Sequence, residues 1–136
     1  MTPSHIEHIG IAVRDLTSAI SLYEKLLGIK CYSIEEIADQ KVRTAFFRVG
    51  ETKIELLEST DPEGPIAKFI EKRGEGIHHI AFAVRDLAGQ IRNAEEKGIV
   101  LIDKVPRKGA EGLDIAFLHP KSSGGVLIEI CEDKSR

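Results

Sequence analysis

The sequence lacks the features that mark membrane, secreted and nucleic-acid-binding proteins. No apolar run in its 136 residues approaches the roughly 20 residues that a helix needs to cross a bilayer. The first residues have neither the charged nor the apolar region of a signal peptide. A net charge of −3 and a pI near 6.0 offer no basic face for nucleic acid. We therefore expect a soluble, cytoplasmic protein with no membrane or nucleic-acid partner.

Cysteine is also scarce. Cys31 and Cys131 stand apart in apolar segments and form no CxxC pair. Cysteines in this context are typical of core thiols in a reducing compartment rather than of redox or zinc sites. The cytoplasm is the simplest compartment for such a chain.

An internal repeat is the most informative feature that the sequence does contain. The segment His8-Ile-Gly-Ile-Ala-Val-Arg-Asp-Leu16 returns 71 residues later as His79-Ile-Ala-Phe-Ala-Val-Arg-Asp-Leu87, and the mismatches are small or apolar. A repeat of this length predicts two copies of one structural unit.

Each copy predicts the same order of elements. A helical stretch follows each repeated segment and is closed by a Gly-Ile pair, because glycine tolerates the left-handed conformation after a helix. An aspartate before each helix is a typical N-cap. Three extended segments follow, and a segment rich in proline, glycine and charge joins the copies. The expected elements are helices at 17–27, 66–72 and 88–97, N-caps at Asp15 and Asp86, and strands at 31–37, 43–49, 53–58, 100–105, 113–119 and 125–131.

These elements predict one α+β domain over residues 1–136, with module 1 at about 5–60, a linker at about 61–76 and module 2 at about 77–133. Each module reads β-α-β-β-β, and neither alone can bury both its sheet face and its helix. We therefore expect two tandem βαβββ modules forming a curved, partly closed eight-stranded mixed sheet. Such a sheet leaves edges and apolar surface, so we also expect a homodimer.

Four polar side chains interrupt the apolar strands and predict a metal site inside that sheet. Strand residues alternate faces, so His8 and His79 share their faces with small residues, which suits a concave surface. Glu55 and Glu129 lie between apolar neighbours, where a carboxylate is costly unless it is paired or bound to a cation. A lone histidine or glutamate on a strand is usually structural or solvated, but repetition of the pair favours metal binding. Two histidines and two glutamates suit a first-row divalent ion whose shell water or substrate can complete.

The other three histidines are not expected to be ligands. His78 is adjacent to His79 and must point to the opposite face, and the repeat register selects His79. His5 lies too early in the strand and is expected at the surface. His119 stands at a strand end, where we expect it to order a loop or to face the substrate.

The repeated strands, together with Glu55 and Glu129, resemble the vicinal oxygen chelate (glyoxalase, bleomycin-resistance and dioxygenase) superfamily over nearly the whole chain. Three segments are similar to its methylmalonyl-CoA epimerase branch: Lys53-Ile-Glu-Leu-Leu-Glu58, Gly76-Ile-His-His-Ile80 and Phe117-Leu-His-Pro-Lys-Ser-Ser-Gly-Gly-Val-Leu-Ile-Glu129. The resemblance implies interconversion of (R)- and (S)-methylmalonyl-CoA, by removal and return of the C2 proton through a metal-stabilised enolate.

The resemblance also implies roles for individual residues. Carried over by motif, His8, Glu55, His79 and Glu129 would bind Co²⁺ or Mn²⁺, with Zn²⁺ possible, and a glutamine replaces Glu55 in some relatives.

Inversion at C2 needs an acid/base group on each face, and the resemblance gives Glu129 one of these roles. In some relatives the other group is a glutamate where this sequence has Thr44, which is a poor base. Lys41, Gln40 and a water molecule therefore stay open for the second role.

Two other functions share the same resemblance. Glyoxalase I uses similar ligands but would need a glutathione site, and ligand-sequestering proteins of this fold usually lack the full ligand set. An acyl-CoA substrate would need basic residues for its phosphates. The candidates for that contact are Lys104, Arg107, Lys108 and Lys121.

Overall fold

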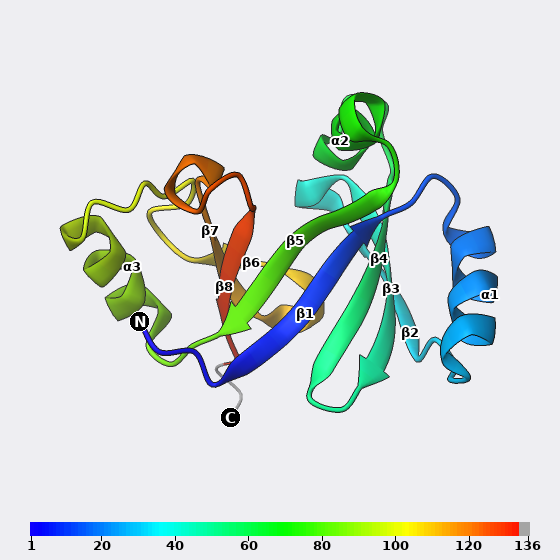
Figure 1. Cartoon of the computed structure of the whole chain (residues 1–136), viewed down its shortest axis with the longest axis horizontal. Helices are drawn as coiled ribbons and strands as arrows, with labels where there is room; N and C mark the ends of the chain where they lie inside the picture. The colour runs from blue at the N-terminus through cyan, green and yellow to red at the C-terminus, as the bar shows by residue number, and fades with distance from the viewer. Residues whose placement is uncertain (134–136) are drawn as a thin grey trace. The chain divides into compact units, whose positions relative to one another are not determined.

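The computed structural model describes residues 1–133 and contains eight strands and three α-helices in that range (Figure 1). Hydrogen bonding orders the strands β2-β3-β4-β1-β5-β8-β7-β6. β5 and β8 run parallel, whereas β2–β3, β3–β4, β6–β7 and β7–β8 are antiparallel. The expected α+β class and eight-stranded mixed sheet are confirmed. The elements are β1 (His5–Ala12), α1 (Leu16–Leu27), β2 (Ser33–Ile37), β3 (Val42–Val49), β4 (Thr52–Ser59), α2 (Pro65–Arg73), β5 (Gly76–Ala83), α3 (Leu87–Glu96), β6 (Arg107–Lys108), β7 (Asp114–Leu118) and β8 (Ile128–Glu132).

None of the helices within residues 1–133 is long and apolar enough to cross a bilayer. The described residues form two compact units, one of residues 9–78 and one that combines residues 1–8 with residues 79–133. The boundary falls inside β1 and β5, so each of these strands contributes residues to both units. As a consequence, His8 and His79 belong to the same unit.

In the unit of residues 9–78, α1 packs against β3 and β4. Asp15 begins the helix, because its Oδ1 accepts a hydrogen bond from Ser18 N, and Gly28 ends it with a φ of 69°. Both ends agree with the sequence expectation. The core under the helix is apolar and comprises Val13, Leu16, Ala19, Ala45, Phe47 and Leu56.

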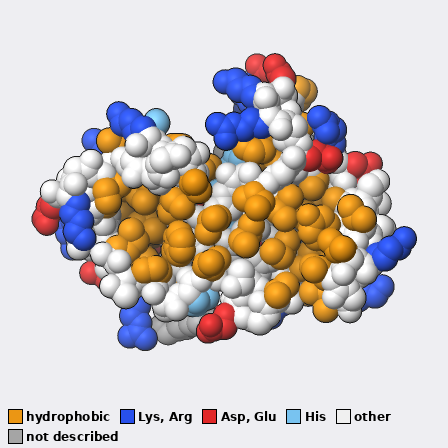
Figure 2. All heavy atoms as spheres, in the orientation of Figure 1, with side chains coloured by type: hydrophobic (Ala, Val, Ile, Leu, Met, Phe, Trp, Pro, Cys, Tyr) orange, Lys and Arg blue, Asp and Glu red, His pale blue; other side chains and the backbone are white. Residues whose placement is uncertain are grey.

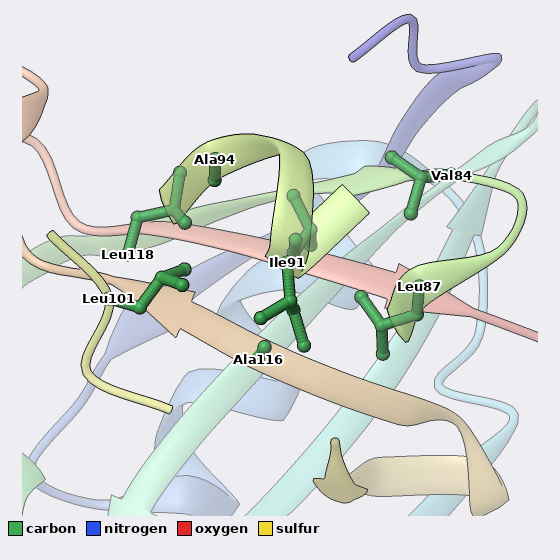
Figure 3. Close-up of a cluster of buried hydrophobic side chains, with 8 residues drawn as sticks. Val84, Leu87, Ile91, Ala94, Leu101, Ala116 and Leu118 are labelled. Atoms are coloured by element: carbon green, nitrogen blue, oxygen red, sulfur yellow. The ribbon is translucent and has the colours of Figure 1, made fainter. Parts of the chain in front are cut away.

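In the other unit, α3 packs on β7 and β8 (Figure 3). Asp86 caps this helix in the same way, through Gly89 N. The helix residues Leu87 and Ile91 are fully or almost fully buried among aliphatic side chains of the strands. The whole cluster comprises Val84, Leu87, Ile91, Ala94, Leu101, Ala116, Leu118 and Ile130.

A carboxylate from the last strand of each half also holds the start of each long helix. Glu58 Oε2 on β4 accepts from Leu16 N at 3.0 Å. Glu132 Oε1 on β8 accepts from Leu87 N at 2.9 Å. The first amide groups of a helix have no partner within it, so these two glutamates satisfy donors that would otherwise be unpaired.

The structure differs from expectation at residues 100–105, which were predicted to form a strand. Only Leu101 forms an isolated bridge there, to Leu118, and the edge strand is β6 instead. Asp103 supplies the physical reason, because its Oδ2 accepts from Phe117 N at 2.9 Å. Backbone bonds from Ile102 N to Phe117 O and from His119 N to Val100 O still join this segment to β7. At Phe117 N, however, a side-chain acceptor takes the place of a backbone carbonyl, so no regular ladder continues toward residue 105.

Candidate metal centre

Three of the four expected ligands converge within one compact unit. His8 lies on β1, His79 on β5 and Glu129 on β8. The Nε2 atoms of the two histidines are 3.0 Å apart. The Oε1 atom of Glu129 lies 3.5 Å from Nε2 of His8 and 3.3 Å from Nε2 of His79. Residues separated by 50 positions or more in the sequence therefore aim three donor atoms at one point.

Strand geometry explains this convergence. β5 and β8 are paired in parallel with Ala81 opposite Glu129, so residues of odd number on both strands face the same side. His79 lies two residues before Ala81 on β5 and therefore faces this side as well. All three candidate ligands are buried, with 3–6% of their surface exposed.

Glu7 orients the first imidazole, and sequence reasoning missed it. Its Oε1 lies 2.6 Å from Nδ1 of His8. A carboxylate oxygen only accepts, so Nδ1 carries the hydrogen, and Nε2 of His8 is the nitrogen that could bind an ion at the shared point once its own proton is released. Metal-bound histidines usually donate their other N–H to such a partner. The only signal in the sequence for this contact was the position of an acidic residue directly before His8.

Phe117 contributes to the position of the second imidazole. Its ring meets the ring of His79 edge-on, with centroids 5.6 Å apart and planes at 79°. The rings of His79 and His8 are themselves nearly perpendicular, at 89°. Packing of this kind restricts ring rotation and keeps Nε2 of His79 directed at its partners.

Glu129 is ionised in this environment. Burial alone would raise the pKa of its carboxyl group, but the charges and hydrogen bonds of His8 and His79 outweigh burial and lower the pKa to about 2. The centre therefore offers an anionic oxygen beside two imidazole nitrogens over the whole neutral range.

This donor set fits a divalent first-row ion. Two imidazoles and a carboxylate are the ligands that such ions commonly take, and these three residues form a group with donor atoms within 4.8 Å of one another. Two ligand atoms at roughly 2.1 Å from one ion and at right angles to each other would lie about as far apart as the two Nε2 atoms do. The expectation of a metal site is thus supported by the geometry of three residues.

The fourth expected ligand, Glu55, belongs to the other compact unit. It lies on β4 opposite Phe46 and is 3% exposed. Its Oε2 atom lies 3.9 Å from Nζ of Lys53. Glu129 lies opposite Phe117 in the same way, so the two glutamates occupy equivalent positions of the repeat.

The residues considered for the second acid/base role lie in different environments. Thr44 is fully buried on β3, and its Oγ1 has no hydrogen-bond partner among the described residues. Lys41 is exposed, with its Nζ 3.7 Å from Oδ2 of Asp61. Gln40 is half-buried at the end of a short 3₁₀ helix, Ala38–Gln40.

The remaining histidines lie outside the centre. The ring of His78 packs edge-on against Phe69 at 4.9 Å. Nδ1 of His119 accepts from Lys121 N at 3.1 Å, which is a loop-ordering contact. His5 lies 2.8 Å from Oγ of Ser4 through its Nδ1.

Two of the four basic residues considered for coenzyme A phosphates take part in ion pairs. Nε of Arg107 lies 3.2 Å from Asp103, and Nζ of Lys108 lies 2.7 Å from Asp114. Lys104 and Lys121 are exposed.

Comparisons with known proteins agree with this geometry. The family model described as Glyoxalase/Bleomycin resistance protein/Dioxygenase superfamily matches residues 7–117. The chain is 43% identical over 131 residues to an uncharacterized Bacillus subtilis protein, YqjC, covering 96% of this chain and 94% of that one. It is 39% identical over 127 residues to the ethylmalonyl-CoA/methylmalonyl-CoA epimerase of Cereibacter sphaeroides, covering 92% and 95%. A variant of Streptomyces coelicolor methylmalonyl-CoA epimerase, solved in complex with 2-nitronate-propionyl-CoA, superposes with a TM-score of 0.94 at 34% identity, covering 98% and 97%.

Proposed function

Because the chain belongs to the Glyoxalase/Bleomycin resistance protein/Dioxygenase superfamily, we propose that it is an isomerase that interconverts (R)- and (S)-methylmalonyl-CoA. The observation that carries the proposal is the buried convergence of His8, His79 and Glu129 in a chain that aligns with an epimerase over almost its full length.

The proposed ligand set is His8, His79 and Glu129 together with Glu55. Co²⁺ or Mn²⁺ is favoured, and Zn²⁺ is the alternative, because mixed nitrogen and oxygen donors suit all three. A bound divalent ion would supply Lewis-acid stabilisation of the enolate charge that develops when the C2 proton leaves. The residues of the chain must bind the thioester, exclude water and move the proton.

Glu129 is proposed to move the proton on one face of C2. Its lowered pKa keeps the carboxylate ionised at neutral pH, so it begins the reaction as a proton acceptor. Inversion then requires that a proton be delivered to C2 from the opposite face. The unpartnered, buried hydroxyl group of Thr44 supports a water molecule held there as the second proton carrier, with Lys41 and Gln40 as the alternatives to test.

The proposed partners are an acyl-CoA thioester and a second copy of the chain. Neither Cys31 nor Cys131 forms a disulfide in the described part of the chain, which supports the cytoplasm as the proposed compartment. We also propose that the chain is one domain built from two tandem modules, at about residues 5–60 and 77–133.

A paired assay tests the function. Purified protein reconstituted with Co²⁺ is given (R)- or (S)-methylmalonyl-CoA, and separately the methylglyoxal–glutathione adduct that glyoxalase I uses. We expect epimerisation of the first substrate, abolished in His79→Ala, and no turnover of the second. Turnover of the adduct alone would identify glyoxalase I chemistry, and binding without turnover of either would identify a ligand-sequestering protein.

A further inference from the structure

The two halves of the chain differ on one face of the sheet, and the difference centres on Lys53. The equivalent strand pairs β3–β4 and β7–β8 place Phe46 opposite Glu55 and Phe117 opposite Glu129. Counted from these glutamates, Lys53 corresponds to Leu127, because each residue precedes its glutamate by two positions. A lysine therefore stands where the repeat otherwise has an apolar side chain.

The second half shows how this face is filled without a charge. Leu127 packs there against a buried apolar cluster that includes Ile115 and Phe117. At the position equivalent to Ile115, the first half has Thr44, which is also polar and buried. Two apolar positions of the repeat thus carry a hydroxyl group and an ammonium group in the first half only.

Lys53 is buried to an extent that is rare for lysine. It is 3% exposed, and lysine is almost never fully buried unless it is paired. Its Nζ lies 3.9 Å from Oε2 of Glu55, which is longer than a hydrogen bond, and 5.8 Å from the centroid of the Phe46 ring. The cation therefore lies against Glu55 and an aromatic face and not in bulk water.

We propose that Lys53 is a specificity-determining residue whose ammonium group binds the free carboxylate at the acyl end of the substrate. The inference rests on the proposed function, because it assigns a contact within the same reaction. Lys53 and Glu55 have the same orientation on β4, so the substrate group that approaches Glu55 also approaches Lys53. A buried ammonium group favours a thioester that carries this carboxylate over one that lacks it, since the charge of the ammonium group is poorly screened there.

Binding of two thioesters that differ only in this carboxylate tests the proposal. Methylmalonyl-CoA and propionyl-CoA are titrated by calorimetry into Co²⁺-loaded wild type, Lys53→Met and Lys53→Arg. We expect Lys53→Met to raise the Kd of methylmalonyl-CoA by about 10- to 100-fold, the loss typical of a hydrogen bond to a charged group, with the Kd of propionyl-CoA unchanged. Lys53→Arg should recover part of the difference, and Lys25→Met, which removes an exposed lysine on α1, should behave as wild type.

A second comparison covers the possibility that Lys53→Met leaves Glu55 as an uncompensated buried charge and does not fold. Glu55→Gln is then compared with Glu55→Gln/Lys53→Met, since both lack that charge, and the same selective loss is expected. Equal weakening of both thioesters, or no change in either, would overturn the assignment of Lys53 while wild-type epimerisation stands. Failure of wild type to bind or epimerise methylmalonyl-CoA would instead overturn the proposed function, and the assignment with it.

Discussion

At the residue scale, the metal centre depends on contacts that reach beyond its ligands. Glu7 holds Nδ1 of His8 at 2.6 Å, and Phe117 packs edge-on against His79. Both contacts orient an imidazole ring, and so the direction of its Nε2 atom, without touching the shared point. Loss of such a supporting contact typically lowers metal affinity by about 10- to 100-fold.

Glu7→Gln should therefore weaken Co²⁺ binding by about tenfold or more. A glutamine oxygen still accepts the hydrogen bond, but it is neutral and makes His8 a weaker ligand. Competition titration against a chelator of known affinity measures the change. Glu51→Gln, which alters an exposed glutamate in the turn before β4, is the matched control. Equal affinities in wild type and Glu7→Gln would show that Glu7 does not support the site.

Glu129→Gln should damage catalysis more than metal affinity. Glutamine keeps an oxygen ligand and nearly the same volume but cannot accept a proton at neutral pH. Loss of a general base typically costs about 10²–10⁴ in rate. The decisive measurement is uptake of solvent deuterium at C2 of each stereoisomer, made with the metal site of the variant shown to be saturated.

Two results of that exchange experiment have distinct meanings. Exchange retained for one stereoisomer in an inactive variant would place Glu129 on the opposite face of C2. Epimerisation at the wild-type rate would remove Glu129 from the acid/base role and leave it as a ligand only.

At the scale of elements, the last strand of each half supplies a carboxylate that caps a helix: β4 caps α1, and β8 caps α3. Glu132 accepts from the backbone N–H groups of both Asp86 and Leu87, and Glu58 accepts from Leu16 N. These contacts tie the first turn of each helix to the sheet, and the same strands carry Glu129 and Glu55. In each half, one strand therefore carries both a glutamate that caps a helix and a glutamate that is a candidate metal ligand.

Glu132→Ala should lower the free energy of unfolding by about 1–2 kcal/mol, since it leaves two helix N–H groups without their charged acceptor. Urea denaturation followed by circular dichroism measures the loss. Glu95→Ala, on the exposed side of α3, serves as a control because it removes a glutamate that caps nothing. A loss no larger than that of the control would show that the contact contributes little to stability.

At the scale of the whole molecule, apolar side chains remain on the surface of both units. Leu22 and Leu26 on α1, in the unit of residues 9–78, are 58% and 68% exposed, and Val105 in the other unit is 73% exposed. Hydrophobic side chains gather on the face shown in Figure 2. Exposed apolar area of this kind often marks an interface.

We therefore expect a homodimer in solution. Sedimentation equilibrium at micromolar protein should give about twice the chain mass of 15.0 kDa, with and without Co²⁺. Leu26→Glu would place a charge within the apolar surface of α1 and tests whether this helix takes part. A wild-type mass of 15.0 kDa would contradict the dimer, and a dimer that survives Leu26→Glu would place the interface elsewhere.

The sequence alone determined the repeat, the eight-stranded α+β class and both aspartate caps, and it is the source of the prediction of the candidate ligands. These features follow from local rules, because strand alternation and helix capping depend on residues only a few positions apart. The same rules failed at 100–105, where backbone pairing with β7 stays short and Phe117 N bonds to the side chain of Asp103 instead of a backbone carbonyl. That contact joins residues 14 positions apart and has no local signature.

Only the tertiary structure decided which polar side chains meet and how deeply they are buried. It brought Nε2 of His8 within 3.0 Å of Nε2 of His79 and placed Glu7 behind the first imidazole. It also buried Lys53 beside Glu55. From residue type alone, a lysine at this position would be expected in solvent. Burial and convergence depend on strand pairing between distant segments, and the free energy of a charge depends on what surrounds it.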